Sequence, residues 1–471
     1  MTGGVGRHEV GLYARPHTIP IMPSPLTHTL VTTDAVGRAF ADEALFSAMC
    51  RFEIALARAE AVAGVIPDAA ATAIADVVRT AAIDDAVALR VSLRANATLS
   101  IAVVQALSAR VAQAHPEAAR YVHWGATSQD VFDTALMLCL RDAWIAIEAD
   151  HLRLMAALDA LAVRHARTVM LGRTLLQPAV PTTFGLKAAG WLGTLARSWR
   201  AWASTFDRTQ VVQFGGAAGT LSALGTHGPA VEQALAEDLG LEIPDAPWHA
   251  HRDRLAAFVA AAGVYVGALG KLAGDVALLM QPEIGEAFEA GGGSSTMPHK
   301  RNPSRCAVVV ACAHRVPGLV ATMLGAMVQE HERAVGGWHV EAATLVDTVQ
   351  ASASAAASMA DVLESLTIDD VRMRANIEAT RGTIFAERLV MRLAPDLGRQ
   401  EAAALVKTAL EAAAASGRSL ADAAADLPAL ADRLTADERA TLFEADTYLG
   451  SAETFRARLL AAAAAPGSRR H

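Results

Sequence analysis

A glycine-rich segment at residues 291–303 has the residue types expected of a catalytic loop. It reads Gly-Gly-Gly-Ser-Ser-Thr-Met-Pro-His-Lys-Arg-Asn-Pro, and three consecutive glycines would give it hinge freedom. A serine near a lysine, in a loop that closes and expels water, could act as an alkoxide base. The segment is not a Walker phosphate-binding loop, because the GxxxxGKS or GxxxxGKT spacing is absent. The alternative is a flexible surface linker. The sequence Met-Pro-His-Lys-Arg-Asn-Pro at 297–303 is too specific for such a linker.

A second polar segment, His123-Trp124-Gly125-Ala126-Thr127-Ser128-Gln129-Asp130, lies just before the longest predicted helix. Hydroxyls and free backbone N–H groups at a helix N-terminus bind anions such as a substrate carboxylate. Thr127, Ser128 or Asp130 could instead simply cap the helix. The residues alone leave both interpretations open.

A third segment, Gly172–Gly185, contains two prolines and two glycines that frame Thr174 and Gln177. A plain turn between two helices would explain most of this composition. The segment therefore does not indicate a binding site on its own.

Long helices must position these three segments. Gln129–Arg167 contains neither proline nor glycine, and one continuous helix there would span about 58 Å. Further long helices are predicted at 181–209, 251–281, 303–330 and 338–364, although Pro317 could bend or break the one at 303–330. Helices of such length are expected to pack against each other, and against other chains, in an elongated bundle.

The chain is predicted to be all-α and to divide into four regions. These are an irregular N-terminal arm at 1–30, an N-terminal helical domain at 31–122, a central long-helix bundle with the polar loops at 123–365, and a C-terminal helical domain and tail at 366–471. The tail from Ala461 onward is expected to be frayed.

Composition excludes several classes of function. Apolar residues make up 53% of the 471 residues and aromatic residues 5%, which favours Ala- and Leu-rich helices and excludes wholesale disorder. The net charge is −8 and no basic stripe stands out, which argues against a nucleic-acid partner. The four cysteines lack CxxC spacing, so neither a disulfide framework nor a zinc site is predicted. With no signal peptide or membrane span evident, we expect a cytoplasmic protein without a membrane partner, a metal or a cofactor.

The run Gly-Ser-Ser-Thr-Met-Pro-His-Lys-Arg-Asn-Pro resembles the signature of the fumarase/aspartase superfamily, which includes adenylosuccinate and argininosuccinate lyases. Residues 123–130, 213–221 and 329–333 resemble more narrowly the bacterial 3-carboxy-cis,cis-muconate cycloisomerase branch. The resemblance extends from about residue 35 to about residue 450. It implies an all-α homotetramer in which three subunits build each active site around a small polycarboxylate substrate.

The resemblance also implies roles for individual residues. Ser294 matches the catalytic base, which removes a proton from the carbon next to a carboxylate. Lys300 and Asn302 match the donors that stabilise the resulting aci-carboxylate. The expected substrate-binding residues are His123, Thr127, Ser128, Thr174, Gln177, Gln213 and Arg333.

The sequence departs from the family where members commonly carry a histidine, at the position of Leu175 or Pro178. In adenylosuccinate lyases that histidine is the general acid for the leaving group. Neither residue here can transfer a proton, so a leaving group that is already a stable anion is favoured. The cycloisomerase pattern His-Ala-Glu-Trp is replaced by His339-Val340-Glu341-Ala342, which indicates a different pocket.

Three functions follow as hypotheses. The first is β-elimination of a stable anion from a substituted succinate to give fumarate, as in nitrosuccinate lyases, which release nitrite. The second is 3-carboxy-cis,cis-muconate cycloisomerase, whose leaving group in the reverse direction is also a carboxylate. The third, from another class, is an inactive scaffold like the lens crystallins of this superfamily. The changes near Pro178 and Ala342 place the first slightly ahead.

Overall fold

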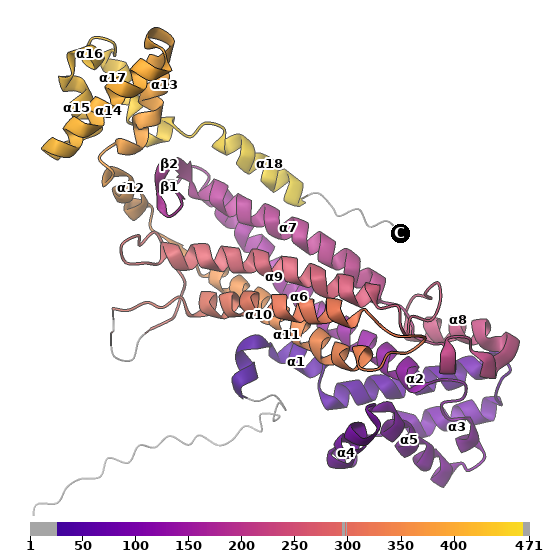
Figure 1. Cartoon of the computed structure of the whole chain (residues 1–471). Helices are drawn as coiled ribbons and strands as arrows, with labels where there is room; N and C mark the ends of the chain where they lie inside the picture. Colours follow the sequence, from indigo (N-terminus) through magenta and orange to yellow (C-terminus); the bar gives the residue numbers. More distant parts are fainter. Residues whose placement is uncertain (1–25, 294–296, 298, 465–471) are drawn as a thin grey trace, which may run out of the picture.

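Five helices of 23 to 37 residues form an elongated bundle in the computed structural model, which describes residues 26–293, 297 and 299–464 (Figure 1). They are α6 (Ser128–Arg164), α7 (Phe184–Thr209), α9 (Asp253–Leu279), α10 (Ser304–Ala326) and α11 (Gly337–Glu364). Consecutive helices run in opposite directions, so every loop lies at one of the two ends. The predicted all-α bundle is confirmed.

Large aromatic side chains fill the middle of this bundle. Trp144 on α6 stacks against Phe206 of α7 and meets Trp202 edge to face. Elsewhere α9 and α10 approach closely at Gly270, where a Cβ atom would lie 2.5 Å from the Cβ of Ala313. Small residues therefore set the spacing between these two helices, which the many alanines of the sequence permit.

A smaller helical group covers one end of the bundle (Figure 1). It comprises α2 (Asp42–Val62), α3 (Asp68–Arg79), α4 (Ala86–Asn96), α5 (Ser100–Ala114) and η2 (Ala118–Tyr121), whereas the preceding η1 (Leu26–Val31) and α1 (Asp34–Ala39) pack against α11 and α6 of the bundle. The segment that follows α7 joins this group, with η3 (Gly216–Ala218), η4 (Ser222–His227) and α8 (Gly228–Leu239). Val212 and Phe214 are buried in the same core. Of the predicted N-terminal arm, residues 1–25 lie outside the described residues.

A second small helical group lies at the opposite end (Figure 1). It contains α12 (Asp370–Glu378), η5 (Thr383–Phe385), α13 (Ala386–Leu397), α14 (Arg399–Ser416), α15 (Leu420–Asp426), α16 (Pro428–Ala431), α17 (Ala436–Leu442) and η6 (Ala445–Thr447). The last helix, α18 (Ala452–Ala464), leaves this group and lies along α7. The expectation of fraying from Ala461 is wrong as far as Ala464, because Arg200 donates to the carbonyls of Ala462 and Ala463.

The segment after α6 is a β-hairpin, and the expected plain turn is wrong. Strand β1 (Val169–Thr174) pairs antiparallel with β2 (Gln177–Thr183), and α7 begins only at Phe184. Two prolines occur in β2 without preventing the pairing, because edge strands tolerate them. The short strands β3 (Ala287–Phe288) and β4 (Thr367–Ile368) form a second pair beside the glycine-rich loop.

Pro317 does not break its helix, since α10 continues to Ala326. Its ring is exposed in the single chain, so it displaces no neighbouring helix of the bundle. Helices α9 and α10 are each long and apolar enough to cross a membrane by length and composition. This is weak evidence for a membrane span, because both pack against each other and against α11 as core helices of the bundle.

Candidate functional site

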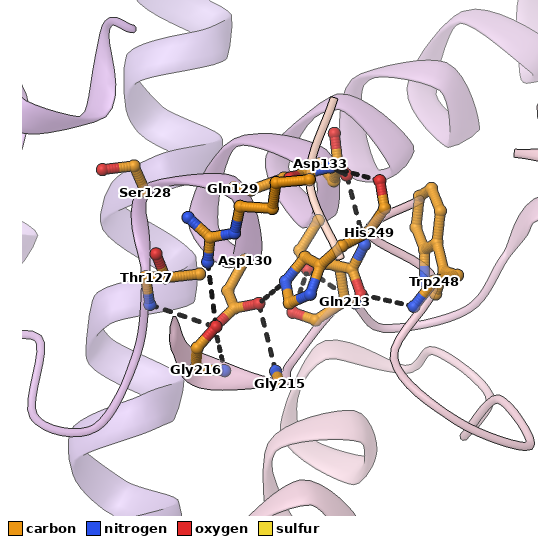
Figure 2. Close-up of polar contacts among 12 residues, drawn as sticks. Thr127, Ser128, Gln129, Asp130, Asp133, Gln213, Gly215, Gly216, Trp248 and His249 are labelled. Carbon is orange, nitrogen blue, oxygen red and sulfur yellow. Dashed lines mark hydrogen bonds and ion pairs between the residues drawn. The ribbon is translucent and has the colours of Figure 1, made fainter. Parts of the chain in front are cut away.

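The N-terminus of α6 gathers three segments around one buried carboxylate (Figure 2). Thr127 is the N-cap of α6, and its backbone N–H donates to Asp130 at 3.0 Å in a capping box. The backbone N–H groups of Gly215 and Gly216 donate to the same carboxylate at 3.1 and 3.0 Å. The Nε2 atom of His249 lies 2.7 Å from it. Asp130 therefore both caps the helix and fixes the loop after α7.

The side chain of Ser128 points away from this carboxylate (Figure 2). Thr127 and Ser128 are half-buried, and the backbone carbonyl of Ser128 accepts a hydrogen bond from Ser100 of α5 at 2.7 Å. The capping role proposed for Thr127 and Asp130 is thus present. The Ser128 hydroxyl lies on the opposite side, at the positive end of the longest helix, where a bound anion would be stabilised.

Gln213, predicted to bind substrate, is 0% exposed and fully engaged with the protein. Its Nε2 donates to Asp133 at 3.2 Å, and its Oε1 accepts from the backbone N–H of Trp248 at 2.9 Å. Arg252 donates to Asp133 at 2.7 Å and to Glu341 at 2.8 Å. The Gln213 amide is therefore closed to solvent in the single chain. In this conformation its role is to hold the loop against α6.

The ion pairs beneath this loop were missed from the sequence. The guanidinium of Arg252 lies over the Trp248 ring at 4.4 Å and forms ion pairs with Asp133 and Glu341. Its side chain is 1% exposed, so the positive charge is buried. Burial raises the pKa of Glu341, against the opposing effect of Arg252. A buried ion pair of this kind must stay complete, because removing one partner leaves an uncompensated charge. The sequence signal for these ion pairs was the presence of charged residues, such as Asp133, inside otherwise apolar helices.

Arg333, predicted to bind substrate, lies at the edge of the same cluster. Its Nη2 donates to the backbone carbonyl of Gly216 at 2.9 Å. Its buried Nε has no hydrogen-bond partner among the residues that the structure describes. Because the side chain is only half-buried, the guanidinium can still donate to a ligand carboxylate beside the N-terminus of α6.

His123 completes this set of predicted residues. Its backbone has φ of 59°, and its Nδ1 lies 2.6 Å from Oε1 of Glu53 on α2. Burial alone would lower the pKa of His123, but the Glu53 charge and hydrogen bond together raise it above the usual value. The structure thus brings His123, Thr127, Ser128, Gln213 and Arg333 to one end of the bundle.

The other predicted residues lie at the opposite end. Thr174 and Gln177 face each other across the tip of the hairpin, and both are exposed. The two residues between them, Leu175 and Leu176, have φ of 49° and 63° and are 96% and 74% exposed. A left-handed backbone is unfavourable for leucine, and such strain tends to be retained at functional positions.

The neck of the glycine-rich loop lies at the same end of the bundle as this hairpin and is closed by backbone contacts (Figure 1). The N–H of Asn302 donates to Gly292 at 2.8 Å, and Gly293 pairs with Arg301. A Cβ atom at Gly292 would lie 1.9 Å from the Asn302 carbonyl oxygen, so only glycine fits there. Lys300 is exposed and Asn302 is half-buried. Ser294, the predicted base, lies outside the described residues.

Two buried glutamates anchor this loop, and the sequence analysis did not identify them. Glu289 accepts from the backbone N–H groups of Arg305 and Cys306 at 2.9 and 3.2 Å, which caps α10. Glu286 accepts from both terminal nitrogens of Arg173 at 2.9 and 2.7 Å, which joins the loop to the hairpin. Their position just before three glycines was the only sequence signal.

The two sets of predicted residues do not meet within one chain. The 37 residues of α6, which connect His123 and its neighbours to the hairpin, span about 55 Å. Helix α9 begins beside Arg252, which shares Asp133 with Gln213 of the first set, and ends at Leu279, seven residues before Glu286. The predicted residues that the structure describes therefore fall into two groups, one at each end of the bundle, which we call the two partial sites.

A cavity of about 400 Å³ lies between α6, α11 and the N-terminal helices, with Phe132, Trp338 and His339 in its wall, and none of the predicted residues that the structure describes lines it. Among the described residues, no group of three or more His, Cys, Asp or Glu side chains could hold a metal ion. All four cysteines are buried free thiols. Burial raises the pKa of Cys50 to about 12, so this thiol is a poor nucleophile.

Comparisons with known proteins match nearly the whole chain. Residues 28–318 match a family model described as a lyase, and residues 382–459 match one described as the adenylosuccinate lyase C-terminus. The 3-carboxy-cis,cis-muconate cycloisomerase of Bradyrhizobium diazoefficiens is 44% identical over 93% of this chain and 98% of its own length. The nitrosuccinate lyase of Streptomyces davaonensis is 40% identical over 93% of this chain and 94% of its own length.

The fold also matches solved structures at similar identity. The 3-carboxy-cis,cis-muconate lactonizing enzyme from Pseudomonas putida superimposes with a TM-score of 0.88, at 42% identity, over 93% of this chain and 98% of that chain. A fumarate lyase from Mesorhizobium superimposes with a TM-score of 0.85, at 35% identity, over 92% of this chain and 98% of that chain.

Proposed function

This chain belongs to the fumarase/aspartase superfamily of lyases, and from that premise we propose that it is a 3-carboxy-cis,cis-muconate cycloisomerase. The observation that carries the proposal is the 44% identity to an enzyme of that name over 93% of the chain. Three further relatives of the same name are 40 to 44% identical. These matches favour the cycloisomerase over the nitrosuccinate lyase that the sequence analysis placed first.

The reaction would be a reversible addition within one molecule. A substrate carboxylate oxygen bonds to one carbon of a double bond, and the proton enters at the carbon next to another carboxylate. In the reverse direction Ser294 removes that proton, Lys300 and Asn302 stabilise the aci-carboxylate, and the lactone oxygen leaves as a carboxylate. The partial site at the other end would hold the remaining carboxylates. No cofactor is required, and a small polycarboxylate substrate suits a cytoplasmic enzyme.

A carboxylate leaving group explains the apolar tip of the hairpin. A carboxylate leaves as a stable anion, so it needs no proton donor at Leu175 or Pro178. The same argument applies to nitrite, which is why the hairpin supports this type of leaving group without choosing between the two reactions.

We further propose that the enzyme is a homotetramer in which three subunits build each active site. Two features support this assembly. The two partial sites lie at opposite ends of one chain, and α10 presents an exposed face of small and apolar residues: Ala307, Ala311, Pro317, Gly318, Ala321, Leu324 and Gly325. Packing this face against other copies would bring opposite ends of different chains together.

Nitrosuccinate lyase remains the second candidate. It is favoured by 40% identity to an enzyme of that name and by Ala342, which replaces the tryptophan of the cycloisomerase pattern. A smaller side chain there would change the shape of the cavity, because Ala342 lies in its wall.

The test is a parallel assay of the purified protein. Lactonisation of 3-carboxy-cis,cis-muconate is followed beside the release of fumarate and nitrite from nitrosuccinate. We expect lactonisation to have the higher kcat/KM, and Ser294→Ala to reduce it by about 10²- to 10⁴-fold while the fold is retained. A preference for nitrosuccinate would reverse the assignment, and activity of Ser294→Ala within tenfold of wild type would exclude this serine as the base. Turnover of neither substrate would refute both functions.

A further inference from the structure

We propose that Glu53 is a positioning residue that holds His123 as an imidazolium, whose Nε2–H then binds a carboxylate of the substrate beside the N-terminus of α6. The substrate class rests on the proposed function. The pairing of Glu53 with His123 rests only on the geometry of α2 and the segment before α6.

The geometry of the pair is that of a charge-assisted hydrogen bond. The 2.6 Å separation between Nδ1 of His123 and Oε1 of Glu53 is short for a nitrogen–oxygen contact. The Glu53 side chain is 1% exposed and that of His123 is 15% exposed, so one partner is enclosed and the other reaches the surface. Because Glu53 occupies Nδ1, Nε2 remains for a further partner.

The backbone of His123 is held in an uncommon conformation. Its φ of 59° lies in the left-handed region, which residues other than glycine seldom adopt. The conformation directs the imidazole toward α2 while the chain turns toward Thr127 and Ser128.

The charges around the imidazole are unequal. Glu53 on α2 and Asp130 on α6 both act on the imidazole by their charge. Glu60, also on α2, interacts with Glu53. Asp130 is already balanced by three backbone donors and His249. Burial and the charge of Glu53 raise the pKa of Glu60 to about 9, so Glu60 is neutral at pH 7. Glu53, whose Oε2 has no partner among the described residues, therefore provides the negative charge that His123 meets.

The protonation state decides what Nε2 can bind. In the imidazolium, Nε2–H donates and carries positive charge, so it attracts a carboxylate. In the neutral ring with Nδ1–H donated to Glu53, Nε2 is a lone-pair acceptor that repels one. Because the pKa of His123 is raised, binding persists to higher pH and is lost as pH rises through this raised value.

The experiment compares Glu53→Gln with Glu60→Gln, a matched control on the same face of α2. Hydrogen–deuterium exchange at the imidazole carbon, read by mass spectrometry, gives the titration midpoint of His123 in the intact protein. We expect the midpoint to fall by about one pH unit or more in Glu53→Gln, since one unit is a tenfold change in the proton equilibrium. The midpoint of His123 should be unchanged in Glu60→Gln, because Glu60 is already neutral below pH 8. Thermal melting confirms that both variants are folded.

Kinetics then test the role of the pair. With carboxymuconate, Glu53→Gln should raise KM at least tenfold at pH 8, with kcat within threefold of wild type, and the two KM values should converge near pH 6. A pair with only a structural role would lower activity at all pH values without this convergence. An unchanged His123 midpoint, an equal effect of Glu60→Gln, or a lowered midpoint without any change in KM would each overturn the proposal.

Failure of the proposed function can be distinguished from failure of this inference. If wild type turns over neither substrate, the exchange measurement still reports on the pair. Binding of tricarballylate, a saturated tricarboxylate, then replaces KM and is measured by calorimetry at pH 6 and pH 8. The same loss at pH 8 in Glu53→Gln supports the inference, and equal affinity of wild type and variant, or no binding at either pH, refutes it.

Discussion

Two buried carboxyl groups on α2 differ in what balances their charge. Glu53 contacts an imidazole, whereas neither carboxyl oxygen of Glu60 has a hydrogen-bond partner among the described residues. Burial together with the charge of Glu53 raises the pKa of Glu60 to about 9. The folded protein therefore retains a proton on Glu60 that the unfolded chain releases above pH 4.5.

Replacing Glu60 by glutamine should stabilise the protein in a pH-dependent way. A raised pKa leaves stability intact below about pH 4.5 and reduces it as pH rises toward 9, by up to about 1.4 kcal/mol per pH unit. Glutamine does not titrate, so the gain in Tm of Glu60→Gln over wild type should be larger at pH 8 than at pH 5. Thermal melts at both values check this. Glu148→Gln, on an exposed position of α6, is the control and should show no such trend.

At the scale of elements, the hairpin between α6 and α7 is the informative one. Its strands are fixed, since Arg173 of β1 is bound to Glu286, yet its tip carries two exposed leucines in a strained turn. An exposed apolar tip on a rigid support is suited to line a pocket of another subunit. It offers no proton to a substrate there.

Introducing a proton donor at this tip should therefore bring no benefit. We expect Pro178→His to leave kcat/KM for carboxymuconate unchanged or lower, because the carboxylate leaving group needs no protonation. Pro178→Asn has a polar side chain that cannot transfer a proton, and it controls for the loss of proline. A gain of threefold or more in Pro178→His, absent from Pro178→Asn, would show that leaving-group protonation limits the rate.

The helices could be predicted from sequence because their apolar periodicity is local. The segment Gln129–Arg167 differs from α6 by at most three residues at either end. The hairpin could not be predicted, since its prolines and glycines are equally typical of a turn. The network of Asp133, Arg252 and Glu341 joins residues more than 80 positions apart, and no spacing along the chain indicates such pairs. The sequence was therefore sufficient to locate the polar loops. The contacts between distant residues could be found only in the folded structure.

At the scale of the whole molecule, the two partial sites predict complementation between inactive variants. His123→Ala alters the first set of residues, and Ser294→Ala alters the glycine-rich loop, whose neck at Gly292 and Asn302 lies at the other end of the bundle. After subunit exchange in an equal mixture, some sites would receive an intact residue from each variant, and activity should recover to about one quarter of wild type. Activity is measured before and after exchange, with exchange itself verified by mass spectrometry of differently labelled subunits.

Each variant exchanged with itself is the control and should remain inactive. No recovery after verified exchange would contradict active sites built from several chains. Activity in the mixture before exchange would instead reveal residual turnover by one of the variants, because every site of an unmixed assembly carries the lesion.

The continuity of α6 has a consequence for how the enzyme can diverge. Each added residue would move one end of a helix by about 1.5 Å and turn it by about 100° relative to the other. Within Ser128–Arg164 such a change would rotate Asp130 away from the glycines that it holds, while the hairpin at the far end stayed in place. We therefore expect relatives of this chain to keep the length of α6. Insertions and deletions should then be confined to the loops, and new specificities should arise by exchange of side chains at the two ends of α6.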